Sequence, residues 1–271
     1  MNPKAPDEVA VLGCGAFVPG FADLGSFARG EADAEHESPI GSLVPLRQRR
    51  RASLLSKSFA DAYGEVLERS GLDPQTVASV FGSALGEAST MIHLLDQMWL
   101  EAGALSPMRF TTSVHNSASG MISIATANRG LTTSLGADFD TPAMALLEGM
   151  GIVLSERTPV IVCCADEAPP EGLVTGTGKG GWGLLAVAIA IGPRNVFPGS
   201  RSVISGVGIE EATRSGPALA ESVARNPIAG LLDLALAIEE GVTGRIGLDR
   251  GAGRGFSVRL CAAADSARLD A

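Results

Sequence analysis

The hydrophobic positions of this chain fall into two patterns, short continuous runs and stripes at helical spacing. Continuous apolar runs predict strands that are buried on both faces, and the stripes predict amphipathic helices. The predicted strands span residues 8–17, 77–83, 110–114, 131–137, 158–165, 184–191, 203–209 and 256–262. The predicted helices span residues 53–70, 87–102, 117–128, 142–154 and 227–240. Because alternating strands and helices imply βαβ connections, we expect one α/β domain over residues 1–271, with a mixed, mostly parallel sheet flanked by helices.

Residues 110–130, FTTSVHNSASGMISIATANRG, join a predicted strand to a predicted helix through small residues only. A tight turn of this kind places Ser117 at a helix N-terminus, where free backbone N–H groups and the helix dipole stabilise a developing negative charge. Many folds place a nucleophile there, so Ser117 is a candidate catalytic residue. Ser and Asn before a helix are also ordinary N-caps, and that alternative stays open.

His115 lies two residues before Ser117 and is the histidine nearest to it in the sequence. It is therefore a candidate general base, although residues so close along the backbone rarely form a productive hydrogen bond without a special bend. The apolar stripe around His93 favours an exposed or packed position for that side chain over a catalytic one.

Four stretches resemble, in the same order, the N-terminal half of β-ketoacyl synthases. The match is to a divergent, chain-length-factor-like branch associated with aryl polyene and related polyketide clusters. The four stretches are RRASLLSK at 50–57, FGSALGE at 81–87, the turn sequence at 110–130, and TTSLGADFDTPAMALLE at 132–148. The resemblance covers roughly residues 8–170 well and the remainder loosely. It implies one half of a thiolase-like fold. The candidate binding residues in these stretches are Asn116, Ser119, Gly120, Phe139, Arg50 and Arg51.

The chain departs from active ketosynthases at the reacting groups. Ser117 stands where the family has its nucleophilic Cys, and no histidine follows it in the sequence. The resemblance places the family's catalytic histidines in a C-terminal half, and we expect that half to be missing from this chain. Since a decarboxylating condensation needs a thiolate to hold the acyl group and imidazoles to stabilise the enolate, the resemblance implies the fold more strongly than the reaction.

Three functions follow from these observations. The leading hypothesis is a non-catalytic subunit that shapes the acyl tunnel of a partner ketosynthase and helps to position acyl carrier protein. A lone half of the fold would leave residues 110–114 and one helical face exposed, so we expect a homodimer or a heterodimer with a full-length ketosynthase. The second hypothesis is an acyltransferase or thioesterase that uses Ser117, with His115 as its partner. The third is a structural homodimer without an acyl ligand.

Composition and charge exclude some classes of partner. Hydrophobic residues make up 45% of the chain and charged residues 19%, which is typical of a compact globular protein. The net charge of -9 argues against a general nucleic-acid or anionic-membrane binder. An acidic carrier protein would need a local basic patch, and Arg47, Arg49, Arg50 and Arg51 form the obvious cluster. The alternative is that these arginines belong to a solvated loop.

The sequence predicts no metal site and no cofactor. Its four cysteines lack zinc-ligand spacing, and the Gly13-x-Gly15 pair lacks the third glycine of a dinucleotide site. The Gly-rich residues 172–183 do not have phosphate-loop spacing, and a mobile loop beside the acyl or carrier site is the better interpretation. Asp166 and Glu167 follow a buried strand without a third ligand, which favours capping.

We also expect a cytoplasmic protein without a membrane span. The longest apolar run, residues 184–191, is far too short to cross a bilayer, and no signal peptide is visible.

Overall fold

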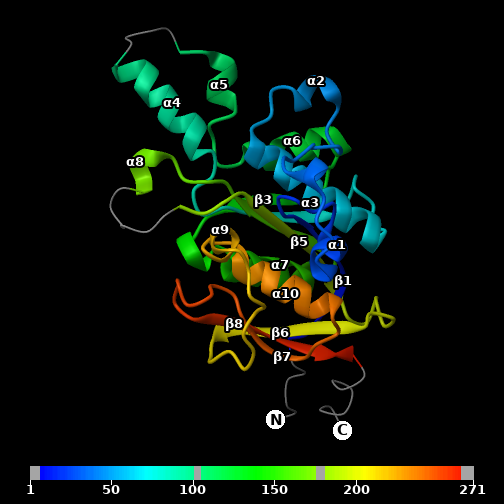
Figure 1. The fold of residues 1–271 in the computed structure, drawn as a ribbon. Coiled ribbons are helices and arrows are strands. Elements are labelled where there is room, and N and C mark those ends of the chain that lie inside the picture. The colour runs from blue at the N-terminus through cyan, green and yellow to red at the C-terminus, as the bar shows by residue number, and fades with distance from the viewer. Residues whose placement is uncertain (1–6, 101–104, 175–180, 264–271) are drawn as a thin grey trace.

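The computed structural model describes residues 7–100, 105–174 and 181–263, whose strands form one eight-stranded sheet (Figure 1). The strands are β1 (Val9–Phe17), β2 (Ala78–Gly82), β3 (Thr132–Leu135), β4 (Val160–Asp166), β5 (Leu185–Pro193), β6 (Ser202–Ile209), β7 (Gly244–Gly247) and β8 (Phe256–Ala262). They lie in the order β3-β2-β4-β5-β1-β6-β8-β7. Among the named strands, β2 pairs parallel with its neighbours β3 and β4, and the other neighbours pair antiparallel. The α/β class and the mixed sheet are confirmed, whereas the parallel part is smaller than the sequence predicts.

Helices cover both faces of this sheet. The longer helices are α3 (Leu54–Ser70), α4 (Ala88–Trp99), α6 (Ser117–Thr126), α7 (Thr141–Glu156) and α10 (Ala229–Glu239). The shorter ones are α1 (Leu24–Arg29), η1 (Ala34–His36), α2 (Leu46–Arg49), α5 (Pro107–Thr111), η2 (Asp138–Asp140), α8 (Glu171–Val174) and α9 (Glu221–Ala224). The helices α3 and α6 pack on one face, and α7 and α10 pack on the other, so the sheet separates two hydrophobic cores (Figure 1). Every residue of β4 and β5 is buried, as their continuous apolar runs predict. No helix of the described residues is long and apolar enough to span a bilayer.

The Gly13-x-Gly15 pair serves helix–strand packing. A Cβ on Gly15 would lie 2.7 Å from the carbonyl oxygen of Ala62 and 2.8 Å from the backbone nitrogen of Val66, both in α3. Only glycine allows α3 to lie this close to β1. Packing of α3 on β1 therefore explains the glycine at position 15 without a bound dinucleotide.

The sequence predicts a strand over residues 110–114, and the structure corrects this prediction. Ser106 caps the short helix α5 by accepting a hydrogen bond from the backbone of Arg109, and Pro107 occupies its first turn. A turn follows and leads into α6. The Thr- and Val-rich sequence favours a strand only where a neighbouring strand can pair with it, because β propensity mostly reflects cross-strand packing. Without such a partner, the Ser-Pro capping signal decides the conformation.

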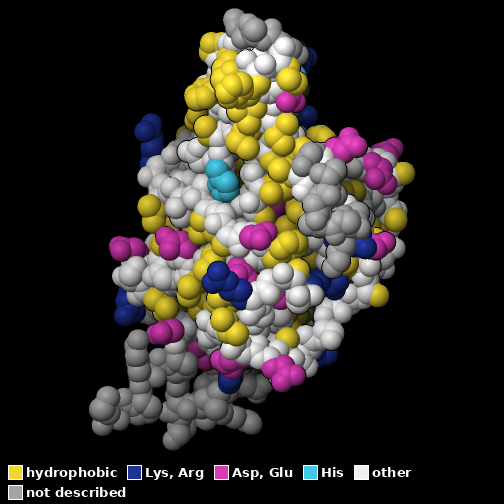
Figure 2. Space-filling view, turned by 90° about the vertical axis from the view of Figure 1, so that its left-hand side faces the viewer, with side chains coloured by type: hydrophobic (Ala, Val, Ile, Leu, Met, Phe, Trp, Pro, Cys, Tyr) yellow, Lys and Arg dark blue, Asp and Glu magenta, His cyan; other side chains and the backbone are white. Residues whose placement is uncertain are grey.

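The helices α4 and α5 extend away from the sheet, and we call residues 88–100 and 105–114 the α4–α5 projection (Figure 1). Only Ala88 and Leu94 of α4 are buried, and no residue of α5 is. Figure 2 shows hydrophobic side chains gathered on its surface. Its exposed large apolar residues are Met91, Leu95, Met98, Trp99, Leu100, Leu105, Met108, Phe110 and Val114. The stripe that predicts an amphipathic helix over residues 87–102 therefore mostly faces solvent.

Candidate functional site

Ser117 is the first residue of α6, as the sequence predicts, and its side chain is half-buried. Its backbone N–H donates to the carbonyl oxygen of Val114, 3.0 Å away. No hydrogen bond between described residues involves its hydroxyl. Gly120 and Ile124 follow at helical spacing and are exposed, Ile124 by 70%. Ser117 therefore lies at the edge of an open helix face.

Ser119 and Asn116 fix the first turn of α6. The Ser119 hydroxyl lies 2.9 Å from the carbonyl oxygen of Asn116 and 2.9 Å from the hydroxyl of Ser134 in β3. Ser119 is buried, whereas the Asn116 side chain is exposed and makes no capping bond. Ser119 thus joins α6 to the edge of the sheet.

His115 binds the backbone of the loop that follows β2. Its Nε2 lies 3.0 Å from the carbonyl oxygen of Ser83. Because that oxygen can only accept, Nε2 carries the proton and donates. A Cβ on Gly86 would lie 2.9 Å from the His115 ring, and one on Gly136 would lie 3.1 Å from its Nε2, so two glycines make room for the imidazole. The structure brings His115 to Ser83 and forms no hydrogen bond between His115 and Ser117.

Ser83 is in turn held by Asp166, at the end of β4. The fully buried Asp166 carboxylate accepts hydrogen bonds from the Ser83 hydroxyl at 2.8 Å and from the backbone N–H groups of Ala84 and Leu85 at 2.8 and 3.0 Å. Burial raises the pKa of Asp166 to about 6, although these bonds favour its ionised form. The predicted capping role of Asp166 is confirmed.

Glu87 closes the same loop and joins it to the start of α3. One of its carboxylate oxygens accepts hydrogen bonds from the hydroxyls of Ser53 and Ser56, each at 2.7 Å. Ser53 also caps α3, because its hydroxyl accepts from the backbone of Ser56. Burial raises the pKa of Glu87. This contact is not among those predicted from the sequence, although a Glu directly before a helix and a Ser-x-x-Ser helix start are visible there.

The arginine cluster directly precedes α3. Arg47 lies in α2, Arg50 and Arg51 follow it, and all three are exposed. Arg49 is partly covered, and its Nε donates to the carbonyl oxygen of Val44. The predicted basic patch is therefore solvent-accessible next to the Ser53–Glu87 contact.

Phe139 lies in η2, between β3 and α7. Its ring packs edge-to-face against Trp182, with ring centroids 5.9 Å apart. The Trp182 indole donates to the carbonyl oxygen of Glu167. Much of the Gly-rich stretch 172–183 lies outside the described residues, so its predicted role as a loop beside the acyl site stays a prediction.

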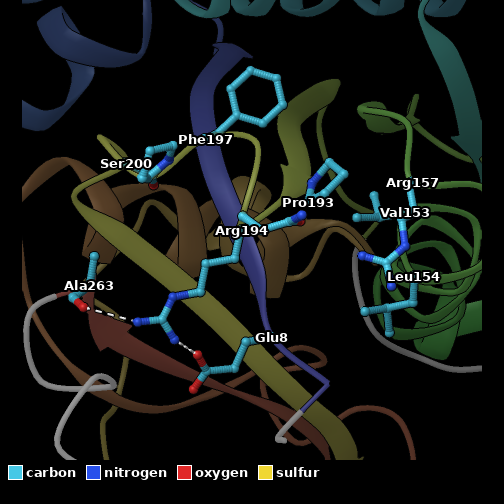
Figure 3. A pocket seen from close by; sticks show the side chains of 11 residues that line it. Glu8, Val153, Leu154, Arg157, Pro193, Arg194, Phe197, Ser200 and Ala263 are labelled. Atoms are coloured by element: carbon cyan, nitrogen blue, oxygen red, sulfur yellow. Dashed lines mark hydrogen bonds and ion pairs between the residues drawn. The ribbon is translucent and has the colours of Figure 1, made fainter.

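Two cavities of the described chain lie away from this turn. A cavity of about 590 Å³ lies beside the C-terminal end of α7, where Arg194 pairs with Glu8 and donates to the carbonyl oxygen of Ala263 (Figure 3). Another of about 840 Å³ surrounds the ion pair of Asp233 and Arg250. Neither is lined by Ser117 or His115. In the described chain, the turn at Ser117 therefore lies outside both cavities.

A family model described as the N-terminal domain of β-ketoacyl synthases matches residues 27–201. The chain belongs to this family, which agrees with the resemblance in its sequence. No curated protein matches the chain.

Solved structures place the fold among ketosynthases and chain length factors. A chain of the complex of the ketosynthase ApeO with its chain length factor ApeC, from Xenorhabdus doucetiae, is similar with a TM-score of 0.66 and 18% identity, over 93% of this chain and 98% of that one. The ishigamide ketosynthase/chain length factor is similar with a TM-score of 0.60 and 16% identity, over 72% of this chain and 65% of that one. A bacillaene synthase ketosynthase from Bacillus amyloliquefaciens matches with a TM-score of 0.57 and 13% identity, over 78% of this chain and 48% of its own length. At these identities the likeness is one of fold.

Proposed function

We propose that this chain is a non-catalytic, chain-length-factor-like subunit that pairs with a full-length ketosynthase in fatty acid or polyketide biosynthesis of the aryl polyene type. The observation that carries the proposal is the apolar surface of the α4–α5 projection. Trp99 and Leu100 are 76% and 79% exposed, and Phe110 is 60% exposed. Contiguous apolar surface of this kind marks a protein–protein interface in soluble proteins.

The choice of a ketosynthase as the partner rests on the solved relatives. Two of the similar structures are described as pairs of a ketosynthase and a chain length factor. One of their chains is matched over 98% of its length, so a chain of nearly this size occurs in such a complex. A heterodimer in which the projection packs on a ketosynthase would cover the exposed side chains.

The geometry around Ser117 supports an accessory role. A serine hydroxyl needs an adjacent base to become a nucleophile, and no hydrogen bond between described residues joins Ser117 to His115, the imidazole nearest to it in the sequence. Ser117 lies at an open helix face, where water is not excluded from a bound acyl group. The exposed Arg50 and Arg51 would then help to position an acidic acyl carrier protein.

The test is purification of the chain from its native host, identification of bound proteins by mass spectrometry, and reconstitution of the pair from purified subunits. We expect a ketosynthase, a one-to-one complex by light scattering, and condensation of acyl and malonyl thioesters only when the ketosynthase is present. The Ser117→Ala variant should support the same product formation as the wild type. Condensation by the purified chain alone would overturn the proposal.

A serine-reactive acyl-thioester probe distinguishes the enzyme hypothesis. The open hydroxyl at the start of α6 is the observation in its favour. Ser113→Ala is the matched control, because its hydroxyl donates to the carbonyl oxygen of Phe110 in the same turn. Labelling that is lost in Ser117→Ala but kept in Ser113→Ala would favour an acyltransferase or thioesterase. A homodimer without label or partner would favour the structural hypothesis.

A further inference from the structure

Both ends of the α4–α5 projection are fixed to one short loop, residues 83–87. At the start of α4, Glu87 accepts hydrogen bonds from Ser53 and Ser56 of the α3 terminus. At the far end, His115 donates to the Ser83 carbonyl. The residues that accept these hydrogen bonds, Ser83 and Glu87, are only four positions apart in the sequence. The orientation of the whole projection therefore depends on this loop.

The loop itself is rigidly held. Asp166 accepts from the Ser83 hydroxyl and from the next two backbone N–H groups, and the Ser83 hydroxyl accepts from the backbone of Gly86 at 2.8 Å. Gly86 has a φ of +59°, which permits the bend that brings the loop under the imidazole. Because the buried Asp166 carboxylate accepts several hydrogen bonds, it fixes the position of the loop to which His115 binds.

At its α5 end, the projection forms most of its side-chain hydrogen bonds within itself. The side-chain hydroxyls of Thr111, Thr112 and Ser113 donate to carbonyl oxygens within three residues. Arg109 bonds to His93, which belongs to the same projection. Among the described residues, His115 supplies the one hydrogen bond from residues 107–116 to a residue outside the projection and α6.

We propose that His115 is a positioning residue that sets the angle of the α4–α5 projection for its partner, through the hydrogen bond from Nε2 to the Ser83 carbonyl. This inference rests on the proposed function, because the surface it orients is the one assigned to the ketosynthase. Loss of the bond frees the α5–α6 turn while the two cores, which His115 does not enter, stay intact.

The experiment compares wild type, His115→Ala and His115→Gln, with His36→Ala as a control for loss of a histidine elsewhere. Gln is the rescue variant, since its side-chain amide nitrogen can donate where Nε2 does. Amide hydrogen exchange is measured on each chain alone, and the dissociation constant is measured with the ketosynthase that co-purifies with the chain from its native host. We expect His115→Ala to exchange faster in residues 84–86 and 107–120 and to bind on the order of tenfold more weakly. His115→Gln should restore both, and the melting temperature should change little.

Hydrogen exchange tests the role of His115, and binding by the wild type tests the pairing with a ketosynthase. If wild type fails to bind any ketosynthase, the proposed function fails, and unchanged exchange in His115→Ala would separately overturn the role of His115. If wild type binds and His115→Ala matches it in exchange and affinity, only the positioning role is overturned. A His115→Gln variant as weak as His115→Ala would show that the hydrogen bond is not the cause.

Discussion

The hydroxyl of Ser83 donates to Asp166 at 2.8 Å, across 83 residues of sequence, and joins the ends of the parallel neighbours β2 and β4. Ser83 also accepts the hydrogen bond from His115, and its loop leads directly into α4. Residues far apart in the chain meet here because parallel strands end at the same edge of the sheet.

The pH dependence of stability should report on Asp166. Its folded pKa of about 6 lies above the unfolded value of 3.8, so the folded state binds the proton more tightly between these values. The contribution of Asp166 to the free energy of unfolding is therefore largest below pH 3.8 and is lost as the pH rises towards 6. In the wild type, Asp166 should lower the free energy of unfolding by roughly 1–3 kcal/mol as the pH rises over this interval. We expect this fall to be absent in Asp166→Asn.

Urea unfolding of both proteins at several pH values between 4 and 7 measures this difference. Other buried carboxyl groups with a raised pKa, such as Glu65 and Glu87, affect both proteins equally. Parallel pH profiles for wild type and Asp166→Asn would contradict the assignment.

Trp99 should be a principal contact of the ketosynthase interface. It is 76% exposed on the α4–α5 projection, and tryptophan is enriched among residues that dominate binding energy. We expect Trp99→Ser to weaken the complex at least tenfold, by isothermal titration calorimetry, with an unchanged melting temperature. Val196→Ser is the matched control, because Val196 is also exposed but lies outside the projection. Equal effects of the two substitutions would remove the projection as the interface.

Charge reversal at Arg50 and Arg51 should slow transfer of the acyl group from acyl carrier protein to the partner ketosynthase. Both side chains are exposed, and like charges would then face an acidic partner. We expect about a tenfold loss in the second-order rate constant at low salt, and a smaller loss at high salt where charges are screened. The exposed Arg157 follows α7, which packs on the opposite face of the sheet from α3, so Arg157→Glu should have little effect. A loss that does not depend on salt would argue against electrostatic docking.

Gly15→Ala should destabilise the fold. The added Cβ would meet backbone atoms of α3 at 2.7 and 2.8 Å, so the helix must move away from β1. We expect the free energy of unfolding to fall by about 1–3 kcal/mol in denaturant titrations. Gly208→Ala in β6 is the control, because nothing lies within 4 Å of its added Cβ. A neutral Gly15→Ala would mean that α3 and β1 are not packed this closely.

Part of the candidate site was predictable from the sequence. Ser117 begins a helix after a tight turn, and Asp166 is a capping carboxylate at a strand end, because both roles depend on local chain direction and residue type. The hydrogen bond between His115 and Ser83 was not predictable, since it joins segments 32 residues apart whose approach depends on two glycines.

The sequence by itself determined the buried strands and the helices that cover them. The runs that became β4 and β5 and the stripe that became α3 follow from hydrophobic periodicity, which requires no knowledge of neighbours. The tertiary structure decided what depends on neighbours. It gave residues 107–111 a helix because no strand pairs with them, limited parallel pairing among the named strands to β2, β3 and β4, and left the apolar face of α4 exposed. Strand pairing and burial are relations between distant segments, and a hydrophobic pattern shows only that a face needs covering, not what covers it.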